Sequence, residues 1–186
     1  VQKSSGAFFT GKKLALKASL FVRPINNRSK VLDPCCGAGD LLLAYARHLP
    51  VANDLKTTLD LWEPLIYGFD VHPEFVKAAR IRLLLLAMHR CQTVGDFDEK
   101  IINKVFGNIK VGNSLLTLDS IRKCDNIIIN PPYSPIKAPK ECTWAKGNVS
   151  SAAVFMDKCI SVATDKSKIS AILPDVLRTG SRYSRW

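Results

Sequence analysis

Short apolar runs in this chain alternate with longer stretches in which apolar residues recur at helical spacing. This alternation is typical of a parallel sheet whose strands are connected by helices. The apolar runs predict strands at residues 30–34, 65–70, 109–111, 126–129 and 169–173. The helical spacing predicts helices at residues 12–22, 40–48, 73–89, 149–163 and 174–178.

Right-handed crossovers restrict how these strands are arranged. They place the first strand near the middle of the sheet, the second and third on one side, and the fourth on the other side. The switch point, where open α/β sheets bind ligands, then lies between strands 30–34 and 126–129. Residues 51–62 form an unusually long connection, which we expect to be partly helical.

Polar residues mark three of the predicted helix starts. Thr10 is predicted to cap the helix that begins at Gly11. Asp40 follows a glycine turn at the start of the next helix. His72-Pro73-Glu74 opens the third helix, with proline in the first turn and the acidic residue at the positive end of the dipole.

Length and composition favour one domain. The 186 residues are 47% hydrophobic, enough for a single core. No apolar run is as long as the roughly eighteen residues of a membrane span, and no signal peptide is visible, so we expect a cytoplasmic location and no membrane association. The six cysteines form no C-x-x-C pair and have no histidine at ligand spacing, which argues against a metal site and against a disulfide framework.

Charge adds an expectation about partners. The net charge of +11 and the isoelectric point near 9.5 favour a polyanion, with nucleic acid as the leading candidate. The alternative is that the lysines only solvate the surface.

The most informative motif is Asn130-Pro131-Pro132-Tyr133, directly after an apolar strand. The two prolines have fixed φ angles and no N–H group, so the turn is stiff and leaves backbone carbonyls available as acceptors. With the Asn130 amide and the flat ring of Tyr133, the turn is suited to hold a planar ring that carries an amino group. The alternative is a proline-rich turn that ends a buried strand.

A glycine loop follows the first strand, in Asp33-Pro34-Cys35-Cys36-Gly37-Ala38-Gly39. Its glycines let the backbone bend and approach a ligand closely. Leu42 breaks the dinucleotide pattern, and Asp33 would repel a pyrophosphate, so a cationic cofactor fits better. A simple tight turn remains the alternative.

Two further strand ends carry polar residues. Asp70 ends the second strand, where a carboxylate can accept both hydroxyls of a ribose or can cap the next helix. Gly112-Asn113-Ser114 ends the third strand, and the Asn113 amide can pair with an adenine edge.

Together these motifs resemble the N-6 DNA methylase family, the amino-adenine DNA methyltransferases of restriction–modification systems. They occur in the family's order over almost the whole chain. The motifs are Gly6-Ala7-Phe8-Phe9-Thr10, Asp33 to Gly39, Gly68-Phe69-Asp70, Gly112-Asn113-Ser114 and Asn130 to Tyr133. The resemblance implies a Rossmann-like S-adenosylmethionine-dependent methyltransferase fold, with a mostly parallel sheet and helices on both faces.

The resemblance also implies roles for individual residues. Thr10 and the 33–39 loop would hold the amino-acid end of S-adenosylmethionine, with Asp33 near its ammonium. Asp70 would take the ribose hydroxyls, and Asn113, where many relatives have Asp, the amino group of the cofactor's adenine. The implied cofactor-binding residues are Phe9, Thr10, Asp33, Pro34, Cys35, Gly37, Gly39, Asp70, Val71, Asn113 and Ser114.

The implied reaction is methyl transfer to the N6 amino group of an adenine flipped out of DNA. The implied catalytic residues are Asn130, Pro131, Pro132 and Tyr133: the Asn130 oxygen and the Pro131 carbonyl would accept the two amino hydrogens, and Tyr133 would stack on the base. Cys35 and Cys36 are expected to pack in the loop and not to act as nucleophiles.

Other acceptors stay open, because the same motif occurs in enzymes that methylate protein glutamine or RNA bases. An inactive module that binds cofactor or nucleic acid is a further alternative. Three lysines after the motif, with Trp144, either contact DNA beside the flipped base or belong to a mobile surface loop. These lysines are Lys137, Lys140 and Lys146.

We expect one catalytic domain over residues 1–186, with an N-terminal cofactor-binding segment and helix at 1–29 and a Rossmann-like core at 30–186. The family continues with further strands and a target-recognition region after Leu173-Pro174. We therefore expect a sheet truncated at its C-terminal strands, no target-recognition region in this chain, and target recognition supplied by a specificity subunit or a C-terminal domain.

Overall fold

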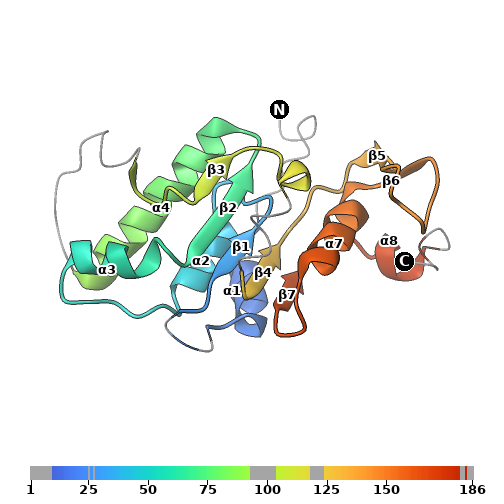
Figure 1. Ribbon diagram of the computed structural model, residues 1–186. Helices are drawn as coiled ribbons and strands as arrows, with labels where there is room; N and C mark the ends of the chain where they lie inside the picture. The colour runs from blue at the N-terminus through green and yellow to red at the C-terminus, as the bar shows by residue number, and fades with distance from the viewer. Residues whose placement is uncertain are drawn as a thin grey trace.

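A central parallel sheet dominates the computed structural model, which describes residues 10–24, 26, 28–92, 104–117, 124–180 and 183. The strand order is β3-β2-β1-β4-β7, and every neighbouring pair is parallel (Figure 1). The strands are β1 Val31–Asp33, β2 Ile66–Asp70, β3 Ile109–Val111, β4 Asn126–Ile129 and β7 Lys168–Ala171. This order confirms the prediction, with β1 in the middle and the switch point between β1 and β4.

The helices follow the predicted positions closely. They are α1 Lys12–Phe21, α2 Asp40–Ala46, α3 Leu55–Trp62, α4 Pro73–Cys91, α7 Ser151–Val162 and α8 Val176–Thr179. Helix α3 confirms that the long connection at 51–62 is partly helical. Helix α7 begins two residues later than predicted, because β6 takes up Asn148–Ser150.

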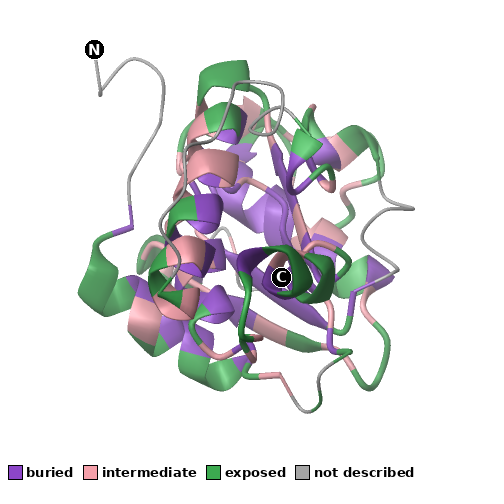
Figure 2. Ribbon diagram, turned by 90° about the vertical axis from the view of Figure 1, so that its left-hand side faces the viewer, coloured by how far each residue is buried: buried purple, intermediate pink, exposed green. Residues whose placement is uncertain are grey.

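Two apolar clusters lie on the two faces of the sheet. Val31 and Ile128 point to one face, where buried residues of α1, α2 and α4 pack. Leu32 and Ile127 point to the other face, where α7 packs. The alternation follows from the two-residue period of a strand. Buried residues therefore lie in the sheet and along the inner sides of the helices (Figure 2), and helices cover both faces as predicted.

The helix starts confirm one prediction and correct another. Helix α4 begins with Pro73 in its first turn, after His72 as N-cap and with Glu74 in the first turn. Helix α1, in contrast, begins at Lys12 with Gly11 as N-cap and no side-chain cap. The predicted cap by Thr10 is wrong, because the Thr10 hydroxyl accepts a hydrogen bond from the Asn130 side chain at 2.9 Å instead.

A small hairpin replaces the loop that the sequence predicted after the Asn-Pro-Pro-Tyr turn. Strands β5 Pro135–Lys137 and β6 Asn148–Ser150 pair antiparallel. Ile136 lies opposite Val149, which is buried. Each strand has three residues and β5 begins with a proline, so the alternation was too short to show in the sequence.

Candidate functional site

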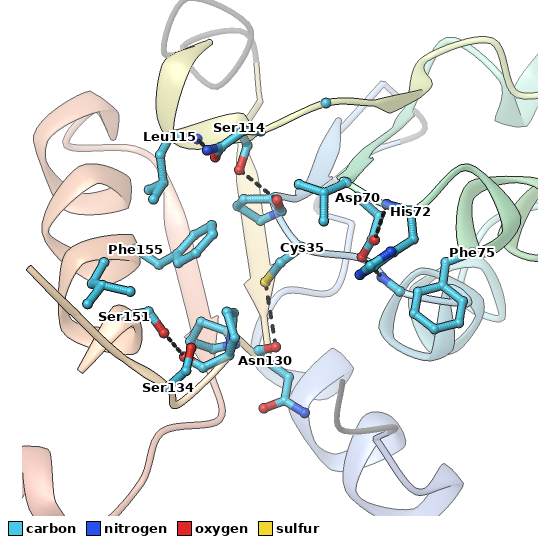
Figure 3. Close-up of a pocket in the computed structure, with 18 residues that line it drawn as sticks. Cys35, Asp70, His72, Phe75, Ser114, Leu115, Asn130, Ser134, Ser151 and Phe155 are labelled. Atoms are coloured by element: carbon cyan, nitrogen blue, oxygen red, sulfur yellow. Dashed lines mark hydrogen bonds between the residues drawn. The ribbon is translucent and has the colours of Figure 1, made fainter. Parts of the chain in front are cut away.

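A cavity of about 280 Å³ opens at the carboxyl ends of β1 to β4, at the switch point of the sheet (Figure 3). This is the position at which open α/β sheets bind ligands. Predicted site residues from all four strand ends line it together. They are Pro34, Cys35, Gly37, Asp70, Val71, Asn113, Ser114, Asn130, Pro131 and Pro132.

A second, smaller cavity of about 30 Å³ lies beside the first. Thr10 and Asp33 line it, and Cys35, Gly37 and Asn130 are shared between the two cavities. Two predicted site residues, Gly39 and Tyr133, line neither cavity, and Phe9 lies outside the described residues.

Gly39 contributes to the site through packing. Gly37 and Gly39 have φ angles of 50° and 85°, a region that favours glycine. A Cβ atom at Gly39 would lie 3.0 Å from the Cβ of Ala79 on α4. Glycine at this position therefore allows the loop to turn and to approach α4 closely.

The Asp70 carboxylate joins the second strand to the glycine loop. It accepts hydrogen bonds from the backbone N–H of Gly37 and from that of His72, each at 2.9 Å. Asp70 therefore orders the entry to α4, as the capping alternative requires. It also lines the cavity, and each carboxylate oxygen keeps a further lone pair for a ligand.

The end of β3 is tied to the glycine loop in a similar way. The Ser114 hydroxyl donates to the carbonyl of Pro34 at 2.6 Å. The Asn113 side-chain oxygen accepts from the backbone N–H of Leu115 at 3.1 Å and caps a 3₁₀ turn, η1 Ser114–Leu116. Ser114 thus holds the cavity wall in place, and Asn113 also lines the cavity.

Asp33 is almost completely buried at the small cavity, with 1% of its surface exposed. Burial raises the pKa of this carboxyl from an ordinary 3.8 to about 8, and the carboxylates of Asp70 and Asp40 add to the rise. The backbone N–H of Cys35 donates to it at 3.1 Å. Within the described residues no basic side chain forms an ion pair with it, so a cationic ligand group would find a buried carboxyl here.

The Asn130 amide is held from both ends by side chains. Its nitrogen donates to the Thr10 hydroxyl, and its oxygen accepts from the Tyr133 hydroxyl, each at 2.9 Å. Its backbone carbonyl lies 3.5 Å from the Cys35 sulfur, which donates to it. In Figure 3 the amide lies at the α1 side of the cavity. Thr10 and Tyr133 together therefore orient this amide.

Tyr133 is half-buried and packs beside the cavity. The carbonyl of Ile172 lies 3.2 Å from the Tyr133 hydroxyl oxygen and shares, as a second and longer acceptor, the one hydrogen that is donated to Asn130. The Tyr133 ring packs against a small cluster that includes Ala152, Ala153 and Leu177. Trp144 belongs to the same cluster and contacts Tyr183. These contacts give Tyr133 an orienting role toward Asn130 in this structure.

The two loop cysteines pack as expected. Cys36 is buried in the core cluster of one sheet face, and Cys35 packs against the other. Burial raises the pKa of both thiols well above the ordinary value. Both are therefore protonated near neutral pH, which makes them poor nucleophiles.

The cavity also contains residues that the sequence did not single out. His72 and Phe75 form one wall from the start of α4, with their rings in an edge contact at 5.3 Å. Phe155 and Ser151 line it from α7, for which the sequence predicted no role in the site, and the Phe155 ring points into the cavity (Figure 3). The apolar spacing of α7 predicted packing alone. A helical pattern shows which residues are buried but not which part of the buried face borders a cavity.

The strand register also places the lysine that follows the turn. Ile136 lines the cavity, and Lys137 is the next residue of the same strand. Successive side chains of a strand point to opposite sides, so Lys137 points away from the cavity. Lys140 and Lys146 are exposed between β5 and β6.

The residues around the two cavities suit a nucleoside-like ligand with a cationic end. A carboxylate ends β2, an amide ends β3, and a buried carboxyl lies at the small cavity. No group of three or more His, Cys, Asp or Glu side chains within the described ranges is placed to hold a metal. None of the helices in the described part of the chain is both long and apolar enough to span a bilayer.

Comparisons with known proteins agree with this geometry. The family model described as N-6 DNA Methylase matches residues 1–182. Type II restriction enzyme and methyltransferase RM.BcgI from Heyndrickxia coagulans is 25% identical over 161 residues, which cover 84% of this chain and 22% of that protein.

Two solved structures share the fold at low identity. The M protein of type I restriction enzyme EcoKI has a TM-score of 0.63 and 18% identity, over 95% of this chain and 36% of that one. DrdV, solved in complex with DNA, has a TM-score of 0.71 and 10% identity, over 99% of this chain and 22% of that one. The present chain thus spans between about a fifth and two fifths of the length of these proteins.

Proposed function

The chain belongs to the N-6 DNA methylase family and has the Rossmann-like fold of S-adenosylmethionine-dependent methyltransferases, and from this premise we propose that it transfers a methyl group to the N6 amino group of adenine in DNA. The observation that carries the proposal is the Asn130 amide, held in place by two side chains at a cavity that the ends of four parallel strands line. The parallel strands bring their carboxyl ends to one edge of the sheet. The oriented Asn130 amide then gives that edge a hydrogen-bond acceptor for an amino group.

We infer that S-adenosylmethionine occupies the β1 to β3 side of the cavity. Asp70 holds the ribose hydroxyls, Asn113 and Val71 border the adenine, and Asp33 lies near the ammonium end at the small cavity. The bound cofactor supplies a methyl group on a positively charged sulfur. The volume of the two cavities taken together suits a ligand of this class, since small-molecule pockets have volumes from about 300 Å³ upward.

The acceptor side of the cavity performs the positioning step in this proposal. An aromatic amine is a poor nucleophile, because its lone pair is delocalised into the ring. The Asn130 side-chain oxygen and the Pro131 carbonyl oxygen each accept a hydrogen bond from the amino group of the base. These two bonds favour a tetrahedral geometry at the amino nitrogen. The amide oxygen has two lone pairs, so it accepts from the base while it still accepts from Tyr133. Catalysis then rests on orientation and electrostatics.

The remaining pocket residues exclude water and hold the base. The Phe155 ring enters the cavity from α7 and offers an apolar face to it. The base must leave the duplex, at a cost of a few kcal/mol for unstacking. The net charge of +11 favours the DNA strand that has to reach this edge.

We further propose that residues 1–186 form one catalytic domain and that target recognition is provided by another domain or by a specificity subunit. The family's solved members are much longer than this chain, which covers 36% of the EcoKI M protein. The identity of the recognised sequence would then depend on that other part.

The test is Asn130→Ala with radiolabelled S-adenosylmethionine and adenine-containing DNA. We expect transfer to fall by about a hundredfold or more, the scale seen when one positioned hydrogen-bonding group is removed from an active site. Cofactor affinity should change much less than the rate of transfer, since Asn130 borders the small cavity but its assigned contact is to the amino group of the base. Undiminished transfer by the variant would refute the catalytic assignment.

Parallel assays with RNA and with protein acceptors separate the remaining reactions. Transfer to DNA that disappears when adenine is replaced by a purine without the amino group supports the proposal. Transfer to RNA or to protein glutamine in preference to DNA would reassign the acceptor, and cofactor binding with no transfer to any of them would indicate a binding module.

A further inference from the structure

Arg82 forms a bridge between helix α4 and the glycine loop. One guanidinium nitrogen donates to the carbonyl of Ala38 at 2.6 Å, and another lies 2.7 Å from the carboxylate of Asp40. The side chain of Arg82 is 41% exposed and that of Asp40 is 21% exposed. The bridge is therefore partly shielded from solvent, and charge-assisted bonds of this geometry are among the stronger ones in proteins.

The loop is joined to helix α4 and to the residue that orders its entry at three places. Near the start of the helix, Asp70 accepts from both Gly37 and His72 and so joins the loop to the helix entry. About two turns further, Ala79 lies against Gly39 so closely that a Cβ at Gly39 would come within 3.0 Å of it. Arg82 adds the third contact. The same helix therefore holds the loop and provides the cavity residue Phe75.

We propose that Arg82 is a positioning residue for cofactor binding. Its bonds to Ala38 and Asp40 hold the segment of residues 37–40 in the position in which it borders the small cavity. The proposal rests on the cofactor part of the proposed function and does not depend on the acceptor. Arg82 lines neither of the two site cavities, so its effect passes through the backbone of the loop.

Electrostatics alone predicts that the loss of Arg82 strengthens cofactor binding, whereas the positioning role predicts that it weakens it. Asp40 lines the small cavity, and Arg82 neutralises it. Removal of the guanidinium would leave an unpaired carboxylate near the cofactor, and that charge would attract a cationic ligand. If charge were the main effect, Arg82→Gln would strengthen the binding of S-adenosylmethionine; if position is the main effect, the variant weakens it.

The experiment measures the dissociation constants of S-adenosylmethionine and S-adenosylhomocysteine by calorimetry. The first ligand carries a sulfonium charge and the second has a neutral sulfur. For Arg82→Gln we expect both ligands to bind about tenfold more weakly, the effect of losing roughly one charge-assisted hydrogen bond. Both ligands carry the ammonium group that the small cavity would hold, so the direction of the change separates the two effects: a misplaced loop weakens both ligands, and an unpaired Asp40 strengthens both.

Two variants grade the effect. Arg82→Lys keeps the charge but cannot reproduce the planar fork, so we expect an intermediate loss. Asp40→Asn removes the ion pair and leaves the bond to Ala38, and we expect a loss smaller than that of Arg82→Gln. These two also carry the test if Arg82→Gln does not fold.

Arg90 provides a matched control on the same helix. It donates to the carbonyls of Ala46 and Leu49, each at 2.8 Å, and not to the loop. Arg90→Gln should lower the melting temperature without changing either affinity. Tighter or unchanged S-adenosylmethionine binding in Arg82→Gln, or an equal loss in Arg90→Gln, would overturn the proposal.

The outcomes also separate this proposal from the proposed function. Wild-type protein that binds neither ligand overturns both. Wild-type protein that binds S-adenosylmethionine but methylates no DNA overturns only the acceptor assignment, and the affinity series of the variants still decides the role of Arg82.

Discussion

The two sides of the cavity are held in different ways. On the β1 to β3 side, polar side chains bind the main chain: Asp70 accepts from two backbone N–H groups, and Ser114 donates to a backbone carbonyl. On the β4 side, the Asn130 amide is held at both ends by other side chains, Thr10 and Tyr133. Both arrangements order a polar group at the same edge of the sheet.

The difference has a consequence for ligand binding. Main-chain partners move only when the loop itself moves, so the cofactor side is preorganised as long as the loop stays in place. Side-chain partners can rotate away, so the acceptor side can adjust when a base enters. We therefore expect substitutions on the first side to change cofactor affinity, and substitutions on the second side to change the rate of transfer.

The largest expected effect is on the cofactor side of the cavity, where the titration of Asp33 should make cofactor affinity depend on pH. Its pKa is about 8 because the carboxyl is buried, so it is protonated at neutral pH in the free protein. A bound cation favours the ionised form, so binding releases a proton. Cofactor affinity should rise as pH increases toward 8 and level off above it, by up to about tenfold per pH unit below 8.

The measurement is the dissociation constant of S-adenosylmethionine between pH 6 and pH 9, for wild type and for Asp33→Asn. The amide cannot titrate, so the slope below pH 8 should disappear in the variant. A wild-type affinity that does not change over this range would show that Asp33 does not interact with the cationic end.

The stability of the free protein should change with pH in the opposite direction. The carboxyl titrates near 3.8 when unfolded and near 8 when folded. Its favourable contribution is fully present below the unfolded pKa and is lost as pH rises through 8. Melting temperatures without cofactor should therefore fall with pH less steeply in Asp33→Asn than in wild type. The same group thus weakens the empty protein under the conditions in which it binds its ligand best.

A smaller effect, on the acceptor side, tests how Tyr133 acts. Tyr133→Phe keeps the ring and removes the hydroxyl that donates to Asn130. We expect the rate of transfer to fall about fivefold, the scale of one hydrogen bond, with unchanged cofactor affinity. Single-turnover transfer rates with saturating DNA give the first quantity, and calorimetry gives the second.

Tyr133→Leu is the companion variant, because it removes the ring as well. Similar rates for the two variants would support an orienting role. A normal rate for Tyr133→Phe with a reduced rate for Tyr133→Leu would instead favour the stacking role that the sequence indicated. Because the ring packs in a cluster with Leu177, melting temperatures must accompany both rates.

The sequence was sufficient for the arrangement of the first four strands and for which polar residues meet at one edge of the sheet. Apolar runs such as Ile127 to Ile129 are long enough to show their strand, and the right-handed crossover rule then favours the first strand in the middle with the fourth on its other side, as the structure has it. The polar residues at the strand ends meet at one edge for the same reason, so Asp70, Asn113 and Asn130 were predicted together and do line one cavity.

The bonds that orient those residues were not predictable, because they join distant parts of the chain. Thr10 reads locally as a helix cap, and only the folded chain brings it to Asn130, 120 residues away. The sequence around Tyr133 indicates an aromatic face for a base. It does not show that the hydroxyl contacts Ile172, which follows α7 and lies 39 residues further along the chain. Arg82 lies in a helix with several basic residues, and nothing local distinguishes a cation that binds a loop from one that faces solvent.

The smallest expected effect concerns the hairpin on the acceptor side. Lys137 lies on the side of β5 opposite Ile136, which lines the cavity. If DNA approaches at the mouth of the cavity, this lysine makes no phosphate contact. Lys137→Ala should then change DNA affinity less than about twofold and leave the salt dependence of binding unchanged, whereas the loss of a true phosphate contact lowers the slope of log K against log salt by about one. Lys56→Ala, on α3, removes an equal charge far from the turn and is the matched control. A slope lowered in Lys137→Ala but not in Lys56→Ala would show that DNA follows the outer side of the hairpin, and the flipped base would then enter across β5.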